Sequence, residues 1–189
     1  MDSSRKCILN AIVVFVSSLF GYPLSAQIND EVSSGAIIFL SSKGLEQVLD
    51  PSGNVVSANL QPGAVLADGF SIKTGFSGEC AVLFSNGTIA TVEPRSQMKV
   101  STFLQKSFEP GEKKISDLQN EPSTSQLILD IATGSLVVQT KKLDRSSSFR
   151  INTPSGTAGI RGTEFQLGLS PGGETKLDVA SSVVSFTPE

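Results

Sequence analysis

The feature that most constrains the fold is a long series of short apolar runs, each bounded by residues that favour turns. From Ile28 onward, runs of about 4 to 9 residues rich in β-branched and aromatic side chains alternate with Gly, Pro, Asn or Ser. Three consecutive examples are ECAVLF, TIATVE and SQMKVSTFL. Most runs recur roughly every 8 to 12 residues, without a 3.6-residue period outside the amino-terminal segment. The sequence therefore predicts an all-β domain with a core of Val, Ile, Leu and Phe side chains.

The amino-terminal segment has the organisation of an export signal. Two basic residues precede an apolar run from Ile8 to Phe20, and small residues lie near Ala26. This order is typical of a signal peptide, and the run is shorter than the roughly 20 residues that span a bilayer. We expect a signal-peptide helix over residues 1–26 that is cleaved, which leaves a periplasmic or secreted domain over residues 27–189 without a membrane span. A leader retained as an anchor is the alternative, because Leu24 is larger than the residue usual at its position.

The composition removes most of the side chains that enzymes use. The chain has no His or Trp, two Cys and one Tyr, and leader removal would also take Cys7 and Tyr22. A Ser or Cys nucleophile would lack its usual base, and a transition metal would lack imidazole and paired thiolate ligands. We therefore expect no catalytic residue, no metal site and no cofactor, with a secreted enzyme that uses lysine or carboxylate bases as an alternative. The remaining thiol, Cys80, is predicted to pack as a small apolar residue.

The charge distribution restricts the class of partner. The chain carries 15 basic and 18 acidic residues, for a formal net charge of −3, and the two signs are interspersed. Nucleic-acid binding requires a basic stripe that neutralises phosphates. Nucleic acid and anionic membrane surfaces are therefore not expected as partners, and the acidic side chains are expected to lie on the surface.

Turn residues mark the corners of the predicted domain. The sequence DPSGN, residues 50–54, predicts a turn, and Asn86-Gly87 predicts a two-residue reversal. Residues 107–125 interrupt the series with charges and two prolines. Such a long segment predicts an exposed excursion that is either functional or disordered, with a single helical turn around EKKISDLQ as an alternative.

Residues 152–168, NTPSGTAGIRGTEFQLG, contain three glycines spaced three apart. Alternating apolar residues predict strands on both sides, so no helix amino terminus is available to bind a phosphate or dinucleotide. We interpret the stretch as a chain reversal in which Pro154 ends one strand and Thr163 begins the next. Arg161 has two interpretations that stay open at this point. Its guanidinium either hydrogen-bonds carbonyls left over by the turn or presents its charge to a protein partner.

Two stretches resemble the signature of the FecR domain family. They are FRINTPSGTAGIRGTEFQL, residues 149–167, and AVLFSNGTIATVEPRSQMKV, residues 81–100, and the resemblance spans roughly residues 33–169. The matching motif and corner residues are Thr153, Pro154, Gly159, Arg161, Gly162, Thr163 and Phe165, with Asn86 and Gly87.

The resemblance implies a non-enzymatic β domain outside the cytoplasm that takes part in protein contacts. It implies a short β-solenoid or roll-like stack of strands, with a β-sandwich as the alternative. The best-known relatives act in cell-surface signalling, where a membrane-bound regulator relays a signal from an outer-membrane transporter to a sigma factor. A cytoplasmic sigma-regulator segment is not expected here, because only about six residues precede the apolar leader. Residues 180–182, Ala-Ser-Ser, also stand where relatives commonly carry a Glu-Gly corner.

We therefore expect an envelope protein that binds another envelope or outer-membrane protein. Strand edges left open at the ends of the stack are the predicted contact, because an exposed edge can pair with a strand of a partner. A structural or self-associating component of the envelope or extracellular matrix is the alternative.

Overall fold

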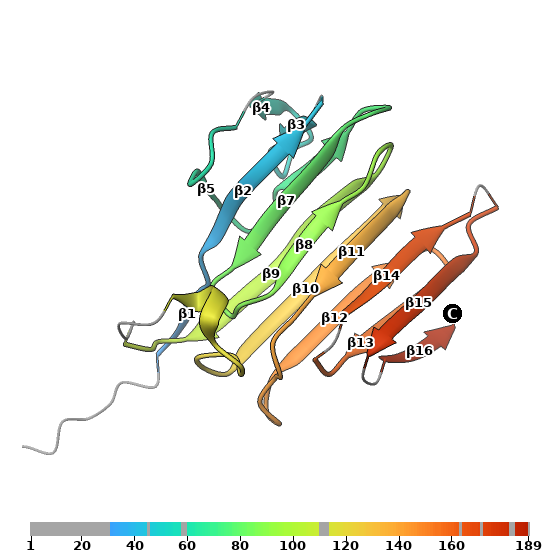
Figure 1. The fold of residues 1–189 in the computed structure, drawn as a ribbon. Helices are drawn as coiled ribbons and strands as arrows, with labels where there is room; N and C mark the ends of the chain where they lie inside the picture. The colour runs from blue at the N-terminus through green and yellow to red at the C-terminus, as the bar shows by residue number, and fades with distance from the viewer. Residues whose placement is uncertain are drawn as a thin grey trace, which may run out of the picture.

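The structure of the chain is a computed structural model. It describes residues 31–44, 46–57, 60–109, 114–162, 164–170, 172–181 and 184–188. The predicted signal peptide over residues 1–26 and the motif residue Thr163 lie outside the described residues. The described chain forms two β-sheets, so the all-β prediction is confirmed (Figure 1).

The first sheet has nine strands. In spatial order it contains β16 (Val184–Pro188), β13 (Gly156–Ile160), β12 (Ser148–Thr153), β10 (Ser125–Thr133), β9 (Gln97–Lys106), β6 (Ser71–Thr74), β3 (Glu46–Leu49) and β4 (Val55–Ser57), while β1 (Val32–Ser34) pairs with β9. The second sheet has seven strands. Its order is β15 (Thr175–Ser181), β14 (Glu164–Leu169), β11 (Ser135–Gln139), β8 (Ile89–Val92), β7 (Glu79–Phe84), β2 (Ile37–Lys43) and β5 (Val65–Leu66).

The pairing of the described strands does not show the expected solenoid-like stack. Among the described strands, β10 and β12 pair in parallel, and the other strand pairs are antiparallel. The alternative, a sandwich-like arrangement of two sheets, fits the structure. Strands with one apolar face bury that face equally well in either architecture, so the sequence pattern does not distinguish the two.

The core lies between the sheets and takes one face from each. Strand β7 shows the alternation, since Cys80, Val82 and Phe84 are buried while Ala81 and Leu83 between them are half-buried. The first sheet contributes Val48, Ile72, Met98, Val100, Phe103, Leu127, Leu129, Ile131, Phe149, Ile151, Ala158 and Ile160 to the same cluster. The burial of Cys80 confirms its predicted place in the core.

A pair of phenylalanines joins the two sheets across this core. The rings of Phe84 and Phe103 lie edge to face, with centroids 5.1 Å apart and planes inclined by 85°. Such an arrangement places the positive edge of one ring against the negative face of the other.

Both predicted corners are present, but the Asn86-Gly87 corner is longer than expected. The amide of Gly87 donates to the carbonyl of Phe84 at 2.8 Å, and the amide of Phe84 donates to the carbonyl of Thr88 at 2.8 Å. Gly87 has φ of +88°, whereas Asn86 does not have a positive φ. A two-residue type I′ reversal requires positive φ at both central residues. The loop between β7 and β8 is therefore a three-residue turn with Gly87 in the left-handed position.

Residues 50–54 form the other predicted turn, between β3 and β4. The Asp50 carboxylate accepts hydrogen bonds from the backbone amides of Ser52 and Asn54, each at 2.9 Å. The hydrogen bonds from the backbone and side chain of Asn54 are the main reason why the pKa of Asp50 is lowered. Gly53 has φ of +88°, which agrees with its expected role in the turn.

The excursion at residues 107–125 is only partly exposed. A single 3₁₀ turn, η1 (Ile115–Asp117), lies within it. Toward its end, however, Glu121 and Ser125 are buried. The end of the segment therefore packs against one end of the sandwich instead of extending into solvent.

Candidate functional site

A cluster of buried polar side chains lies at one end of the sandwich and joins segments far apart in the sequence. We call it the polar cluster, and its members are Asn86, Glu121, Ser125 and Ser147. The Asn86 amide donates to the Ser125 hydroxyl at 3.0 Å, and this hydroxyl donates to Glu121 Oε2 at 2.8 Å. The backbone amide of Ser125 donates to the Ser147 hydroxyl at 2.9 Å. The cluster thus connects the β7–β8 corner, the end of the excursion and the loop before β12.

Glu121 is the centre of the polar cluster, although the sequence predicted that acidic residues lie on the surface. The residue is 9% exposed, and its carboxylate accepts hydrogen bonds from both serine hydroxyls and from the backbone amide of Asp144, the last at 2.5 Å. A buried carboxylate is stable only when such donors replace water. These donors occupy both oxygens, so the group is suited to holding three segments together. No local pattern in its charged, proline-containing surroundings marks this residue.

Arg161 and Gly162 lie at the same end of the sandwich. The Arg161 guanidinium donates from Nη1 to the carbonyl oxygens of Ser147 at 2.7 Å and Arg145 at 3.5 Å. These carbonyls belong to the loop before β12 and not to the glycine-rich turn itself. The first interpretation of Arg161 was that its guanidinium hydrogen-bonds carbonyl groups of the turn. The structure contains hydrogen bonds of this kind, but their carbonyl groups belong to a different loop.

Two glycines of the family motifs allow the backbone around Lys141 to approach closely. A Cβ atom at Gly162, where φ is +96°, would lie 3.0 Å from the Lys141 carbonyl oxygen. A Cβ atom at Gly87 would lie 2.6 Å from the Lys141 side chain. The structure therefore brings the Asn86-Gly87 corner and the Arg161-Gly162 segment together around one loop.

The remaining motif residues lie elsewhere. Thr153 and Pro154 belong to the β12–β13 hairpin at the other end of β12, where the Thr153 hydroxyl donates to the carbonyl of Gly156 at 2.8 Å. Gly159 lies within β13, where a Cβ atom would approach Ser185 Oγ to 2.8 Å, and Phe165 is buried in the core. The described motif residues therefore do not all converge on one pocket, although Gly159 and Arg161 line the same hollow.

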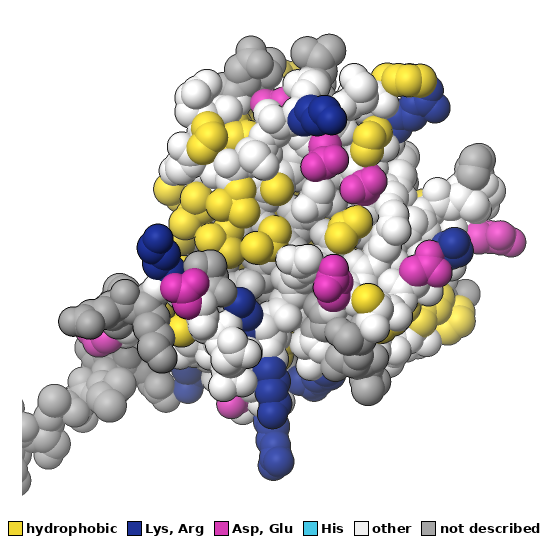
Figure 2. Space-filling model, viewed as in Figure 1, with side chains coloured by type: hydrophobic (Ala, Val, Ile, Leu, Met, Phe, Trp, Pro, Cys, Tyr) yellow, Lys and Arg dark blue, Asp and Glu magenta, His cyan; other side chains and the backbone are white. Residues whose placement is uncertain are grey.

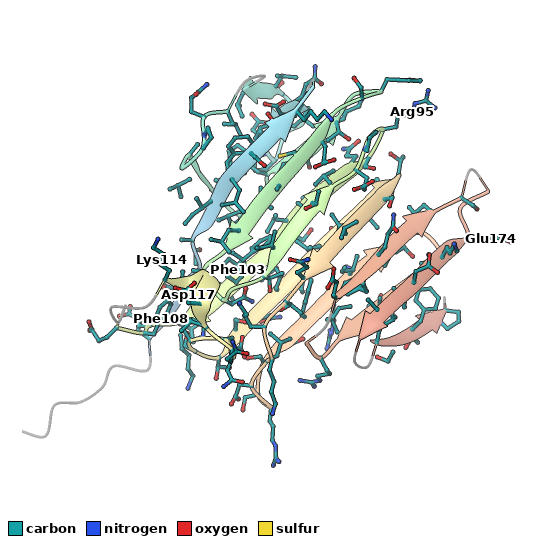
Figure 3. All side chains as sticks on the ribbon, in the orientation of Figure 1. Arg95, Phe103, Phe108, Lys114, Asp117 and Glu174 are labelled. Carbon is teal, nitrogen blue, oxygen red and sulfur yellow. The ribbon has the colours of Figure 1, made fainter. Side chains whose placement is uncertain are left out.

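Arg95 and Phe76 form a pair at the end of the sandwich opposite the excursion. Arg95 has φ of +57°, and its guanidinium carbon lies 3.8 Å from the centre of the Phe76 ring. Figure 3 places Arg95 at one end of the strands and Asp117, in η1, at the other. A cation over an aromatic face is favourable, and here it partly covers a ring that is 76% exposed.

The second sheet carries an apolar row on the face that points away from the core. We call it the apolar outer row, and it consists of Val65, Ile38, Leu83 and Ile89. Val65 is opposite Ile38, Ile38 is opposite Leu83, and Leu83 is opposite Ile89, on strands β5, β2, β7 and β8. Val65 is 72% exposed and the other three are half-buried. Figure 2 shows an apolar area over this part of the sheet.

The apolar outer row ends at β8. On the next two strands the same register continues with Gln139 and Glu164. The outer face of the first sheet instead carries a polar ladder, in which the Asn152 amide donates to Asp130 at 2.7 Å and Thr157 donates to Asn152 at 3.1 Å. The apolar outer row therefore occupies one half of the second sheet.

No metal site was found in the described part of the chain, where no group of three or more His, Cys, Asp or Glu side chains could hold an ion. No helix among the described residues combines the length and apolar character needed to cross a membrane.

Comparison with known proteins identifies the family. The family model described as FecR protein matches residues 70–185. The chain belongs to the FecR family. No curated protein matches the chain.

Two crystal structures of a protein assigned as an anti-sigma factor from Parabacteroides distasonis ATCC 8503 are similar to this FecR-family chain. They are 13% and 12% identical to it, and both have a TM-score of 0.38. Each alignment covers 62% of this chain, which spans about half the length of those proteins, at 50%.

The folded unit extends beyond the part of the chain that matches the FecR family. The match begins just before β6, so β1 to β5 precede it. Strand β2 nevertheless pairs with β7 and places Ile37 and Phe39 in the core. The apolar outer row is likewise shared, because β2 and β5 precede the match while β7 and β8 lie within it. This surface is therefore built jointly by the FecR-matching region and the strands before it.

Proposed function

We propose that this chain is a non-enzymatic FecR-family regulator of cell-surface signalling that acts outside the cytoplasm by binding another protein of the cell envelope. Membership of the FecR family supports the signalling role. The apolar outer row carries the proposal of protein binding. An antiparallel sheet with one solvated face normally alternates apolar and polar side chains, and apolar patches exposed on a soluble protein are typical of protein contacts.

The chemistry of the row indicates the kind of partner surface. Four aliphatic side chains in one register form a flat, uncharged strip, which is suited to an apolar protein face and offers nothing to a phosphate or a sugar. Burial of one such side chain contributes at most about 1.5–3 kcal/mol, so a few of them are enough for a regulated contact. Strand β5 borders the strip and has only two residues. Side chains, more than backbone pairing, therefore carry the proposed contact.

The proposed location follows from the amino-terminal segment described above. A cleaved export signal would deliver the domain to the periplasm or beyond. Disulfide formation is favoured there, but a mature chain with one buried thiol has no second thiol with which to form an internal disulfide. Cell fractionation with amino-terminal sequencing of the mature chain tests this part. A chain that stays in the cytoplasm with its first residues intact would contradict it.

Site-specific photocrosslinking in the native cell tests the contact. The crosslinking residue is placed at Val65, and Val32 serves as the matched control, because it is also an exposed valine on a short strand but belongs to the first sheet. We expect one protein to be captured from Val65 and not from Val32. Leu83→Glu should abolish this capture and change transcription of the regulated genes, whereas Val32→Glu should do neither.

The decisive comparison is between binding and folding of the Leu83→Glu protein. If its thermal unfolding is normal and both capture and transcription are unchanged, the apolar outer row is not the binding surface. A second charged variant, Val65→Glu, keeps the test valid if Leu83→Glu fails to fold, because Val65 contributes little to the core.

A further inference from the structure

The two sheets end in strands of very different length. Strands β4 and β16 end the first sheet, and β5 and β15 end the second. Strands β4 and β5 have three and two residues, β16 has five and ends in Pro188, and β15 has seven. Short edges and proline are common ways by which proteins prevent edge-to-edge pairing. Strand β15 has neither protection.

The free side of β15 presents regularly spaced backbone groups. In the hairpin that joins it to β14, the amide of Ser170 donates to the carbonyl of Glu174 at 2.9 Å. Figure 3 labels Glu174 at this turn. Hydrogen-bonded pairs alternate along an antiparallel ladder, so Lys176 and Asp178 direct their backbone groups toward β14. Thr175, Leu177 and Val179 therefore direct theirs away from it, toward a side where no described strand pairs.

The side chains of β15 divide between its two faces. Leu177 and Val179 stand opposite the buried residues Leu167 and Phe165 of β14, and therefore face the core. Because the sheet ends here, Val179 is still 41% exposed. Lys176 and Asp178 are exposed on the opposite face, with Nζ and Oδ2 3.0 Å apart.

We infer that β15 pairs antiparallel with β15 of a second copy of this chain, about a two-fold axis at Leu177. In this register Leu177 faces Leu177 of the second copy, and Thr175 faces Val179 of the second copy. These are the residues whose backbone groups point outward, so each pair forms hydrogen bonds. The second sheets of the two copies join into one continuous sheet, and Val179 is covered at the junction.

Charge complementarity selects this register and this occupant. Lys176 of each copy stands opposite Asp178 of the other, in the pairs without backbone hydrogen bonds, where side chains approach most closely. Moving the axis by one residue in either direction places Lys176 opposite Lys176 or Asp178 opposite Asp178. An isologous contact repeats both ion pairs, so the strand is complementary to itself.

This contact does not depend on the proposed function. The apolar outer row lies on β5, β2, β7 and β8, whereas β15 is the opposite edge of the same sheet. A dimer through β15 therefore leaves the row accessible to a different protein.

Sedimentation of the full chain over a range of concentrations, with two charge reversals, tests the inference. We expect a reversible dimer. Lys176→Glu places Glu opposite Asp178 twice, and Asp178→Lys places Lys opposite Lys176 twice, so each variant alone should dimerise about tenfold more weakly. An equimolar mixture of the two variants should recover the dimer, because every opposed pair in the heterodimer again has opposite charges. Lys73→Glu, on β6 between Gln47 and Gln97, is the matched control and should dimerise normally.

Three results would overturn the inference. They are a monomer at every concentration, a dimer that neither reversal weakens, and variants that do not recover association when mixed. Thermal unfolding of each variant at a concentration where it is monomeric separates a loss of association from a loss of folding. If the first of these results is accompanied by protection of the β15 amides from hydrogen exchange by a different protein, the edge belongs to that partner.

Discussion

The side-chain amide of Asn86 lies 3.0 Å from the hydroxyl of Ser125, to which it donates a hydrogen bond across 39 positions of the sequence. Ser125 is the first residue of β10, and its hydroxyl in turn donates a hydrogen bond to Glu121, near the end of the long excursion. The corner that belongs to the family signature therefore anchors a segment that has no strand of its own. Networks of this kind strengthen a fold when every member is satisfied, and they are costly when one member is removed.

Glu121→Gln should destabilise the protein by about 2 kcal/mol, because the neutral amide cannot accept from three donors with the strength of a carboxylate. Urea unfolding measures the change. The control is Glu109→Gln, which alters an exposed acid in the same excursion and should cost less than about 0.5 kcal/mol. Equal losses in the two variants would contradict the role of Glu121.

Gly162→Ala should cost more stability than Gly173→Ala. Both glycines have positive φ, at +96° and +83°, so both substitutions carry the conformational cost of roughly 1 kcal/mol. Only at Gly162 would the new Cβ atom also press on backbone, 3.0 Å from the Lys141 carbonyl, whereas nothing lies within 4 Å at Gly173. Thermal unfolding of both variants checks the order. The close approach of the two loops is refuted if the variants are equally stable.

Arg161→Ala should destabilise by about 1 kcal/mol, because the carbonyl of Ser147 loses a charged donor at 2.7 Å. Arg145→Ala is the matched control, since that residue contributes a backbone carbonyl to the contact and its side chain is exposed. Unfolding and partner capture are measured together. Normal stability with weakened capture would instead support Arg161 as a contact for the partner.

Cys80 should resist alkylation in the folded protein well above neutral pH. Burial, followed by the neighbouring charge of Glu46, raises the pKa of the Cys80 thiol from its ordinary 9.0 to about 12. Thiolate is the reactive form, so iodoacetamide should modify the folded chain far more slowly than the urea-unfolded chain at pH 9. Mass spectrometry of the labelled chain measures this, and equal rates would show that the thiol is accessible.

The same pKa predicts the sign of a pH effect on stability. Between pH 9 and about 12 the unfolded thiol releases its proton while the folded thiol keeps it, so folding loses free energy as pH rises. Below pH 9 both forms are protonated and this contribution is fully present. The effect is the difference between the unfolding curves of the original protein and Cys80→Ala. The stability of the original protein relative to Cys80→Ala should fall as pH rises through this window, and a constant difference would contradict this prediction.

The strand series was largely predictable. The runs ECAVLF, TIATVE and SQMKVSTFL correspond closely to β7, β8 and β9, because alternation of apolar residues is a local property of an extended backbone. The glycine-rich stretch was interpreted as one reversal from Pro154 to Thr163, and this was wrong, because Gly156–Ile160 form strand β13, which pairs with β12 and β16. The three-residue turn at Gly87 was not expected either, because the number of residues in a turn depends on which residues close the hairpin as well as on the dipeptide at its tip.

The polar cluster and the apolar outer row were not predictable. Glu121 has the same local setting as an exposed acid, and its burial depends on Ser125, Ser147 and the amide of Asp144, which the fold brings to it. Ile38 and Leu83 likewise look like core residues in the sequence. Only the sheet order places them opposite each other on the outer face.

The sequence by itself determined that the described chain is β-structured, where most of its strands lie and which side of those strands is apolar, because these properties depend on neighbouring residues and a two-residue period. The tertiary structure decided that the strands form two facing sheets, that β15 is left as a long edge, and that a charged residue from the excursion is buried. Those outcomes depend on pairings between distant segments, and the free energy of such pairings cannot be inferred from a local sequence pattern.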